Sequence, residues 1–237
     1  MKELLKTTKD NVDAYFINSG AASCENLQAI YGPKVAQNKT NLDYLKQVIT
    51  VMQLLKCTEE EAYFEASEAA HAIEPTAATA AGCGYMYYKK GDLDKSIGYF
   101  DQAIELEQDP MKKAEYCYNA AVILFSKKQL SRAKQYCNKA ISFNNNYGDA
   151  YILIAQMYAS SPNWSDESAL NKCTFFAVID KLQRAKSVDP SVTDKANELI
   201  RTYSAYTPKD EDLFFLGLSK GHTVTIGGWI GETTTIR

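Results

Sequence analysis

Residue types that commonly carry out chemistry are few and scattered in this chain. It has two histidines, His71 near the end of a predicted helix and His222 at the start of a predicted strand. Neither has cysteine, histidine or carboxylate neighbours at the spacing of metal ligands. Gly82-Cys83-Gly84 lacks the following Gly-Lys-Ser/Thr of a phosphate loop, so a packing seam within a helix explains it better. We therefore expect no metal site and no cofactor.

Two acidic pairs, Glu65/Glu68 and Asp92/Asp94, are the remaining candidates for acid–base chemistry. Solvated helix faces explain them better than paired catalytic carboxylates. The motifs of serine hydrolases, zinc proteases and phosphate-binding loops are absent. We expect that the chain is not an enzyme.

Cysteines offer a second kind of chemistry. No two of them form a Cys-x-x-Cys pair, and the chain is too large to need covalent staples. Three of them, Cys83, Cys117 and Cys137, take positions where the repeat described below wants small or core residues. We interpret the cysteines as small buried hydrophobes rather than as disulfide partners, metal ligands or nucleophiles. The full set is Cys24, Cys57, Cys83, Cys117, Cys137 and Cys173.

Composition excludes several classes of partner. Among the 237 residues, 46% are apolar and 23% charged, with a formal net charge of −3. This balance argues against nucleic acid and membrane surfaces as partners, although the 16 tyrosines could stack on bases or sugars. No stretch is long and apolar enough to span a bilayer, so we expect no membrane insertion.

The N-terminus, Met1–Lys6, has no signal-type apolar core. We expect that the chain begins inside a longer protein. An upstream signal would make it periplasmic or exported, and without one it would be cytoplasmic.

A pattern of small and large residues recurs along the chain and predicts its fold. The first anchors, Gly84, Ala121 and Ala155, are 37 (121 − 84) and 34 (155 − 121) positions apart. A fixed period near this length predicts a helical solenoid, in which each unit buries its apolar face against its neighbours. The two clearest copies read Gly84-x2-Tyr87-x8-Ser96-x3-Phe100-x2-Ala103 and Ala121-x2-Leu124-x8-Ala133-x3-Cys137-x2-Ala140.

Helix start and stop signals place the paired helices. Gly91-Asp92 and Asp109-Pro110 supply caps between consecutive helices. An N-terminal pair is predicted over 3–18 and 24–37, with Gly32-Pro33 kinking or shortening its second helix. The other predicted helices cover 41–56, 59–73, 77–90, 93–106, 111–127, 130–143 and 191–205.

These copies resemble the tetratricopeptide repeat (TPR) over about residues 41–190. Val51, Ser67, Cys137 and Leu182 depart from the usual residue types. The resemblance implies an all-α, right-handed α-solenoid of three to four helix pairs, flanked by N-terminal helices and a small C-terminal β-hairpin or extended tail. The ending, residues 227–237, resembles that of a group of bacterial TPR proteins that are often exported.

In TPR folds the first helix of each pair lines a concave groove, which here would be apolar and aromatic. Such a surface is seldom left open to water. The cover could be a partner protein or peptide, the chain's own termini, or tight curvature of the solenoid. The groove residues predicted to contact a partner are Leu45, Val48, Met52, Leu55, Tyr85, Tyr88, Tyr118, Val122, Phe125 and Ile152.

Two further features bear on binding. The fourth copy carries about eleven extra residues (19 between anchors in place of 8), which we place in a loop over 160–167 where Trp164 would form a second contact edge. Only Asn119 has the residue type and position of a carboxylate clamp, so recognition of a partner's C-terminus is disfavoured.

The tail differs in composition from the repeats. Residues 222–226 and 233–236 predict two strands joined by Gly227-Gly228-Trp229-Ile230-Gly231, and a hairpin this small should dock on the helices through Trp229. We therefore predict an N-terminal pair (1–40), a repeat array with a capping helix (41–207) and a docked tail (208–237).

The leading hypothesis is a non-enzymatic scaffold that binds a protein or peptide, with no nucleic acid as partner and self-association as an added option. The alternative is a structural or assembly domain whose groove is covered by its own termini.

Overall fold

Paired helices form where the sequence repeats small and large residues in the predicted register. The computed structural model describes residues 23–237, and the predicted helix over 3–18 lies outside them. Helices predicted over 24–37, 93–106 and 130–143 have the expected bounds, and α2 continues through Pro33 rather than ending there. The architecture is helical with one small antiparallel hairpin, which confirms the predicted fold class.

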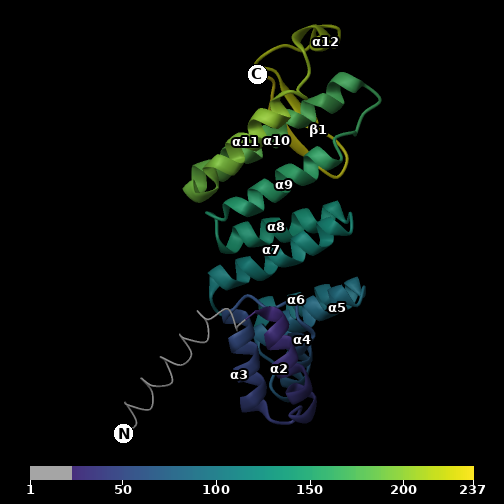
Figure 1. The fold of residues 1–237 in the computed structure, drawn as a ribbon. Coiled ribbons are helices and arrows are strands. Elements are labelled where there is room, and N and C mark those ends of the chain that lie inside the picture. Colours follow the sequence, from purple (N-terminus) through teal and green to yellow (C-terminus); the bar gives the residue numbers. More distant parts are fainter. Residues whose placement is uncertain (1–22) are drawn as a thin grey trace. The chain divides into compact units, whose positions relative to one another are not determined.

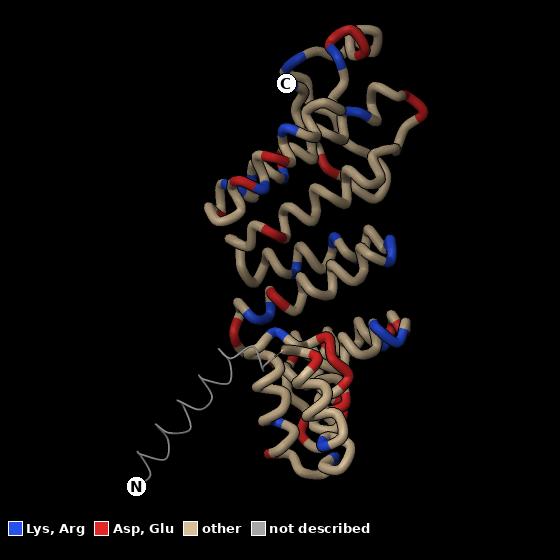
Figure 2. Tube along the Cα trace, viewed as in Figure 1, with Lys and Arg blue, Asp and Glu red and all other residues tan. Residues whose placement is uncertain are grey.

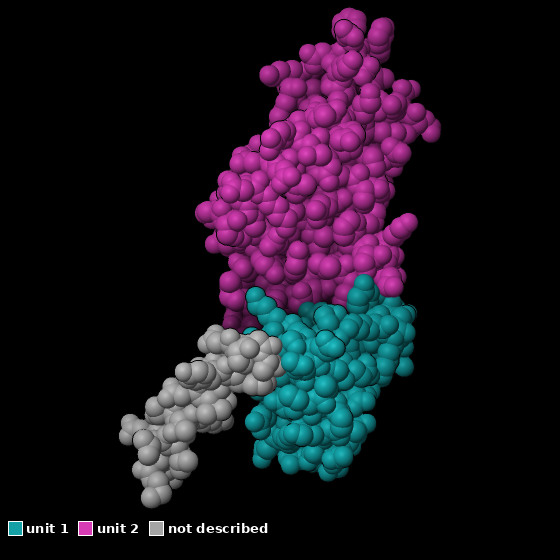
Figure 3. Space-filling view, viewed as in Figure 1, with its two compact units in different colours: residues 1–107 teal, residues 108–237 magenta. Residues whose placement is uncertain are grey.

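The chain divides into two compact units, residues 1–107 and 108–237 (Figure 3). Unit 1 contains α2, which packs on α3 and α4, followed by the pair α5 and α6. The division predicted at residues 40 and 207 stays a prediction. The bounds in unit 1 are α2 (Cys24–Gln37), α3 (Leu42–Leu54), α4 (Glu61–Ile73), α5 (Ala77–Lys89) and α6 (Leu93–Leu106).

Unit 2 stacks its helices in chain order, with the hairpin lying against α10 (Figure 1). The strands pair antiparallel, with Thr223 opposite Thr235 and Ile226 opposite Glu232, and thus confirm the predicted hairpin. The bounds are α7 (Pro110–Ser126), α8 (Leu130–Phe143), α9 (Gly148–Ser160), α10 (Ser168–Val188), the 3₁₀ turn η1 (Pro190–Val192), α11 (Thr193–Ser204), α12 (Asp210–Phe214), β1 (Thr223–Ile226) and β2 (Glu232–Thr235).

Small residues let the paired helices approach closely. A Cβ atom on Gly84 of α5 would lie 2.9 Å from the Phe100 ring of α6, and the Ser96 hydroxyl donates a hydrogen bond to the Gly84 carbonyl at 2.8 Å. Tyr87 differs from the prediction because it is only half-buried and stacks on Tyr99. Other repeat positions are buried, including those of the fourth copy: Ala103, Ala121, Leu124, Ala140, Ala155, Tyr158, Leu182 and Ala185.

The predicted caps are also present. Asp92 accepts a hydrogen bond from the Lys95 amide at 3.1 Å, after Gly91 turns the chain with a φ of +81°. Asp109 accepts one from the Met111 amide at 2.9 Å, and Pro110 takes the first helical position. These contacts satisfy amides that a helix start leaves unpaired.

The extra residues of the fourth copy are mainly helix. The loop predicted over 160–167 is present over 161–167, and α10 begins directly after it at Ser168. The insertion therefore lengthens α10 to 21 residues. This long helix is the one against which the hairpin docks.

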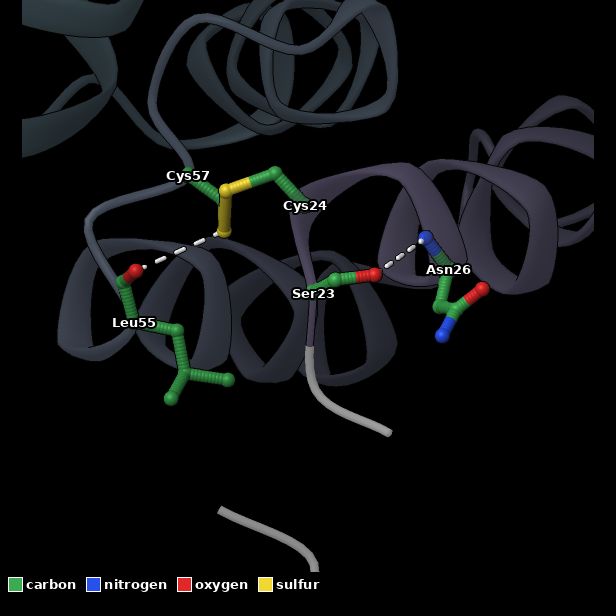
Figure 4. The surroundings of a disulfide bond; sticks show 5 residues. All are labelled: Ser23, Cys24, Asn26, Leu55 and Cys57. Carbon is green, nitrogen blue, oxygen red and sulfur yellow. Dashed lines mark hydrogen bonds between the residues drawn. A yellow bond between two sulfur atoms is a disulfide. The ribbon is translucent and has the colours of Figure 1, made fainter. Parts of the chain in front are cut away.

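A disulfide bond joins Cys24, the first residue of α2, to Cys57 after α3 (Figure 4). Our interpretation of all six cysteines as unpaired was wrong for these two. Their Cα atoms lie 5.2 Å apart, within disulfide range, but this proximity depends on how α2 folds back and no spacing rule foretells it. Burial of the other four as free thiols agrees with the prediction.

Substituting alanine for glycine should change stability in opposite directions at Gly84 of α5 and Gly98 of α6. Replacing Gly84 with alanine should destabilise unit 1 by about 1–3 kcal/mol, because the buried Phe100 ring must move. Gly98 of α6 has no atom within 4 Å of an added Cβ, so Gly98→Ala should stabilise by roughly 0.5–1 kcal/mol. Urea unfolding of both variants checks the signs, and equal signs would contradict the packing described here.

The disulfide should contribute strongly to the stability of unit 1. It closes a loop with a sequence separation of 33, for which chain entropy gives about 3–4 kcal/mol. Denaturant unfolding of the Cys24→Ala/Cys57→Ala variant should show this loss. Adding reductant should lower the stability of the parent chain and leave the variant unchanged. A parent midpoint insensitive to reductant would count against the bond.

Candidate interaction surfaces

The predicted groove residues of α3 lie inside unit 1. Leu45, Val48 and Met52 have no exposed area and share one buried cluster with Leu27 and Val35 of α2. Their predicted exposure to a partner is therefore wrong for this structure. Helix α2 also caps α4, because the Ala62 amide donates to the Gln28 side chain at 2.8 Å.

The remaining predicted groove residues of unit 1 are half-buried. Tyr85 packs edge-to-face on Phe100 with ring centroids 5.1 Å apart, so most of its ring is used inside the unit. Tyr88 and Leu55 are also half-buried. Unit 1 thus presents only the edges of its predicted groove side chains.

Unit 2 has a more open apolar surface along α7. Tyr118 and Phe125 are half-buried and Val122 is 40% exposed. Met111, which was not among the predicted groove residues, is 59% exposed. At 100° per residue these four positions fall within about 60° of arc. We call these four residues the α7 stripe. The spacing of seven residues between Met111 and Tyr118, about two helical turns, could have placed Met111 on the same face from the sequence.

Ile152, predicted to continue this surface, is 1% exposed and belongs to the core of unit 2. The neighbouring α9 is instead joined to the stripe through an aromatic pair. Tyr118 and Tyr147, at the start of α9, have ring centroids 5.2 Å apart. This contact holds the middle of the stripe against the start of α9.

Burial and nearby acid groups keep both tyrosines protonated. Burial, followed by the Asp149 carboxylate, raises the pKa of Tyr118 to about 12. Burial and Tyr118, followed by Glu115 and Asp149, also raise the pKa of Tyr147. The stripe is therefore apolar, and the tyrosine hydroxyl groups stay neutral at physiological pH. The nearby carboxylates of Glu115 and Asp149 make its surroundings weakly negative.

The predicted contact edge at Trp164 faces the chain's own tail. A Cβ atom on Gly227 would lie 2.8 Å from the indole ring, so the hairpin turn packs directly on it. The loop is held by Asn171, whose side chain accepts from the Trp164 amide at 2.8 Å and from the Ser165 amide at 2.9 Å. Partner binding by this half-buried edge stays a prediction.

A second surface holds the tail itself. Glu232 of β2 lies between Lys134 of α8 and Lys181 of α10, with N–O distances of 3.1 and 2.7 Å, and accepts a hydrogen bond from the Tyr158 hydroxyl of α9. Trp229 packs edge-to-face on Tyr158 at 5.5 Å, as predicted for the anchor of the tail. We call the surface formed by Lys134, Tyr158 and Lys181 the tail site.

Further polar contacts extend the tail site. Lys134 also donates to the Ile230 carbonyl at 2.6 Å, and the Thr234 hydroxyl donates to Asp180 at 2.6 Å. The guanidinium of Arg237 pairs with the same Asp180. The docked hairpin is therefore recognised by specific polar groups as well as by apolar burial.

Charge balance decides the protonation state of Glu232. Burial pushes its pKa upward, but hydrogen bonds from Lys181 and Tyr158 and the two lysine charges outweigh this effect. The pKa of Glu232 is consequently lower than its ordinary value of 4.5. Burial and the Glu232 carboxylate together raise the pKa of Tyr158, which keeps its hydroxyl a donor.

Catalytic chemistry has little support among residues 23–237. No group of three or more metal-ligating side chains occurs in that range. The free thiols are buried, and burial raises the pKa of Cys83 to about 12 and that of Cys173 to about 11, which suppresses the reactive thiolate. Each unit carries both basic and acidic residues (Figure 2). Within the same range, no helix combines the length and apolar character that crossing a bilayer requires.

Comparison with known proteins identifies the repeats. The family model described as "Tetratricopeptide repeat" matches residues 83–110 and 114–147. A crystal structure of MamA protein is similar over 80% of this chain and 93% of that chain, with a TM-score of 0.55 and 14% identity. A second structure of MamA covers 70% of this chain and 88% of that one, with a TM-score of 0.52 and 14% identity.

A structure of YrrB, described as a TPR protein with an unusual peptide-binding site, covers 79% of this chain and 98% of that chain. Its TM-score is 0.43 and its identity 16%. At these identities the likeness to solved structures shows the fold alone.

Glu232→Gln should loosen the tail, because two lysines lose their shared carboxylate. We expect a loss of about 1–3 kcal/mol near pH 7, measured by denaturant unfolding. A pKa lowered on folding stabilises the native state above the unfolded value, and this contribution disappears as pH falls through the folded value. The difference between parent and variant should therefore shrink below about pH 4.5.

Glu198→Gln, which alters an exposed carboxylate on α11, is the matched control and should change little. A Glu232→Gln difference that stayed constant down to acid pH would contradict the charge balance at the tail site.

Proposed function

We propose that this chain, which carries tetratricopeptide repeats over residues 83–110 and 114–147, is a non-enzymatic interaction module that holds a partner protein or peptide against the α7 stripe. The observation that carries this proposal is an apolar arc on the first helix of a repeat pair, in which Met111 and Val122 are exposed and Tyr118 and Phe125 are half-buried. Apolar residues grouped on one helix face commonly mark a binding site in a soluble protein.

The stripe suits an amphipathic helix or short peptide with apolar anchors. Such segments place side chains at i, i+3 or i+4, and i+7, which matches the spacing 118, 122 and 125. Glu115 is exposed and lies on the same face of α7 as the stripe. A partner segment with apolar anchors and a flanking basic residue therefore fits this surface best.

The structural alternative has support in unit 1. There Leu45, Val48 and Met52 share one buried cluster with Leu27 and Val35 of α2, and the disulfide joins α2 to the residue after α3, which supports a groove covered by the chain itself. On this hypothesis the chain is a spacer or assembly domain of a larger protein. The two hypotheses differ in whether the α7 stripe binds anything.

Peptide selection against the full chain distinguishes them. A displayed random peptide library should yield apolar peptides whose affinity for Val122→Glu falls at least about tenfold, or roughly 1.4 kcal/mol, because a charge enters the contact. Leu54→Glu is the control, since Leu54 is 67% exposed in unit 1 and outside the stripe. Fluorescence titration measures both. Selected peptides that bind the parent and Val122→Glu equally would refute the α7 stripe as the binding site.

The disulfide also suggests the compartment. Disulfides persist mainly in oxidising environments, so we propose that the chain works outside the reducing cytosol. Protein quenched in acid from its own cells and alkylated without reduction should keep Cys24 and Cys57 unmodified by mass spectrometry. Stoichiometric alkylation of this pair would contradict the proposed location.

A further inference from the structure

The hairpin is attached to unit 2 through contacts that do not involve residues 215–221, the segment that leads into it. The ionic and hydrogen-bonding contacts described above join side chains of α8, α9 and α10 to Ile230, Glu232, Thr234 and Arg237. The preceding residues, 215–221, are exposed or half-buried. Any hairpin with the same sequence could therefore make the same contacts, whichever chain supplied it.

We propose that the tail site also accepts the hairpin of a second copy of this chain, so that two copies exchange tails. The occupant is defined by chemistry visible in the structure. It must place a tryptophan on Tyr158 and a carboxylate between Lys134 and Lys181. A second copy satisfies both requirements with Trp229 and Glu232.

The segment before the hairpin has the properties of a hinge. Gly217 and Gly221 turn the chain with φ of +68° and +93°, a conformation that glycine adopts readily. Opening these turns would extend residues 215–221 by up to about 3.3–3.6 Å per residue. The hairpin could then reach a neighbouring copy while keeping the pairing of residues 223–226 with 232–235, at the loss of the hydrogen bond from the Gly221 amide to the Ile236 carbonyl.

An exposed aromatic pair lies beside this hinge. Phe214 and Phe215 are 78% and 88% exposed, the two largest exposures of large apolar residues in the described chain. Reciprocal exchange is two-fold symmetric and brings the two hinges together. The four phenylalanine rings could then cover one another. This would account for a patch that the single chain leaves in water.

Tail exchange is independent of the α7 stripe, because its contacts are made by residues of α8, α9 and α10. Its partner is the chain itself rather than a foreign peptide. Failure of peptide binding at Val122 would therefore leave tail exchange untouched, and the reverse also holds.

Two cysteine variants of the full chain test the exchange. One copy carries Asp180→Cys and the other, with a different affinity tag, carries Thr234→Cys; the parent side chains are 2.6 Å apart at their oxygen atoms. The copies are co-expressed and oxidised mildly. We expect a covalent heterodimer on a non-reducing gel, whose share rises with protein concentration.

The matched control carries both substitutions in one chain and should form the bond within a monomer. If this bond fails to form, analytical ultracentrifugation of the unsubstituted chain replaces the cross-link: a dimer share that rises with concentration supports the exchange, and a monomer at every concentration overturns it. A control that cross-links within the monomer, combined with no heterodimer at the highest concentration, would overturn the proposal.

The hinge residues provide a second readout. Phe214→Ser with Phe215→Ser should lower the heterodimer share several-fold and leave the melting temperature of the monomer unchanged. Leu54→Ser, which removes another exposed apolar side chain, should leave that share unchanged. An equal share in all three backgrounds would refute the part assigned to the aromatic pair.

Discussion

The close approach of paired helices is the constraint on which the structure depends. Gly84 shows it most clearly, because the Phe100 ring occupies the space where a Cβ would lie and Ser96 bonds to the exposed carbonyl. Helices this close bury the faces between them, but a repeat cannot bury its outer faces alone. The flanking elements follow from that need: α2 covers α3 and α4 in unit 1, and the tail covers parts of α8, α9 and α10 in unit 2.

The two covers use different chemistry. Helix α2 is held by apolar burial of Leu27 and Val35 and by a covalent bond from Cys24. The hairpin is held by a carboxylate shared between two lysines, together with an indole ring on Tyr158. The first cover is therefore stable wherever the disulfide persists, whereas the second depends on the charge of Glu232. Only the second has the polar specificity that would let another copy of the same segment compete for its place.

Much of the fold could be predicted from the sequence, because the relevant signals are local. The small–large period placed the helix pairs, Asp92 and Asp109 marked helix starts, and alternating residues marked the hairpin. Surface assignments were less successful, because they depend on how distant segments fold back. Leu45, Val48, Met52 and Ile152 have the spacing of a groove, but neighbouring elements bury them. The Cys24–Cys57 bond and the lysines around Glu232 join segments that no sequence pattern connects.

The central claim is that α7 presents an open binding surface while α3 is covered by the chain itself. Hydroxyl-radical footprinting with mass spectrometry, with and without a selected peptide, tests it directly. Met111, which is 59% exposed, should oxidise readily and become protected by the peptide together with Phe125, whereas Met52, with no exposed area, should stay unreactive in both states. Ready oxidation of Met52, or peptide protection that leaves Met111 and Phe125 unchanged, would contradict the account.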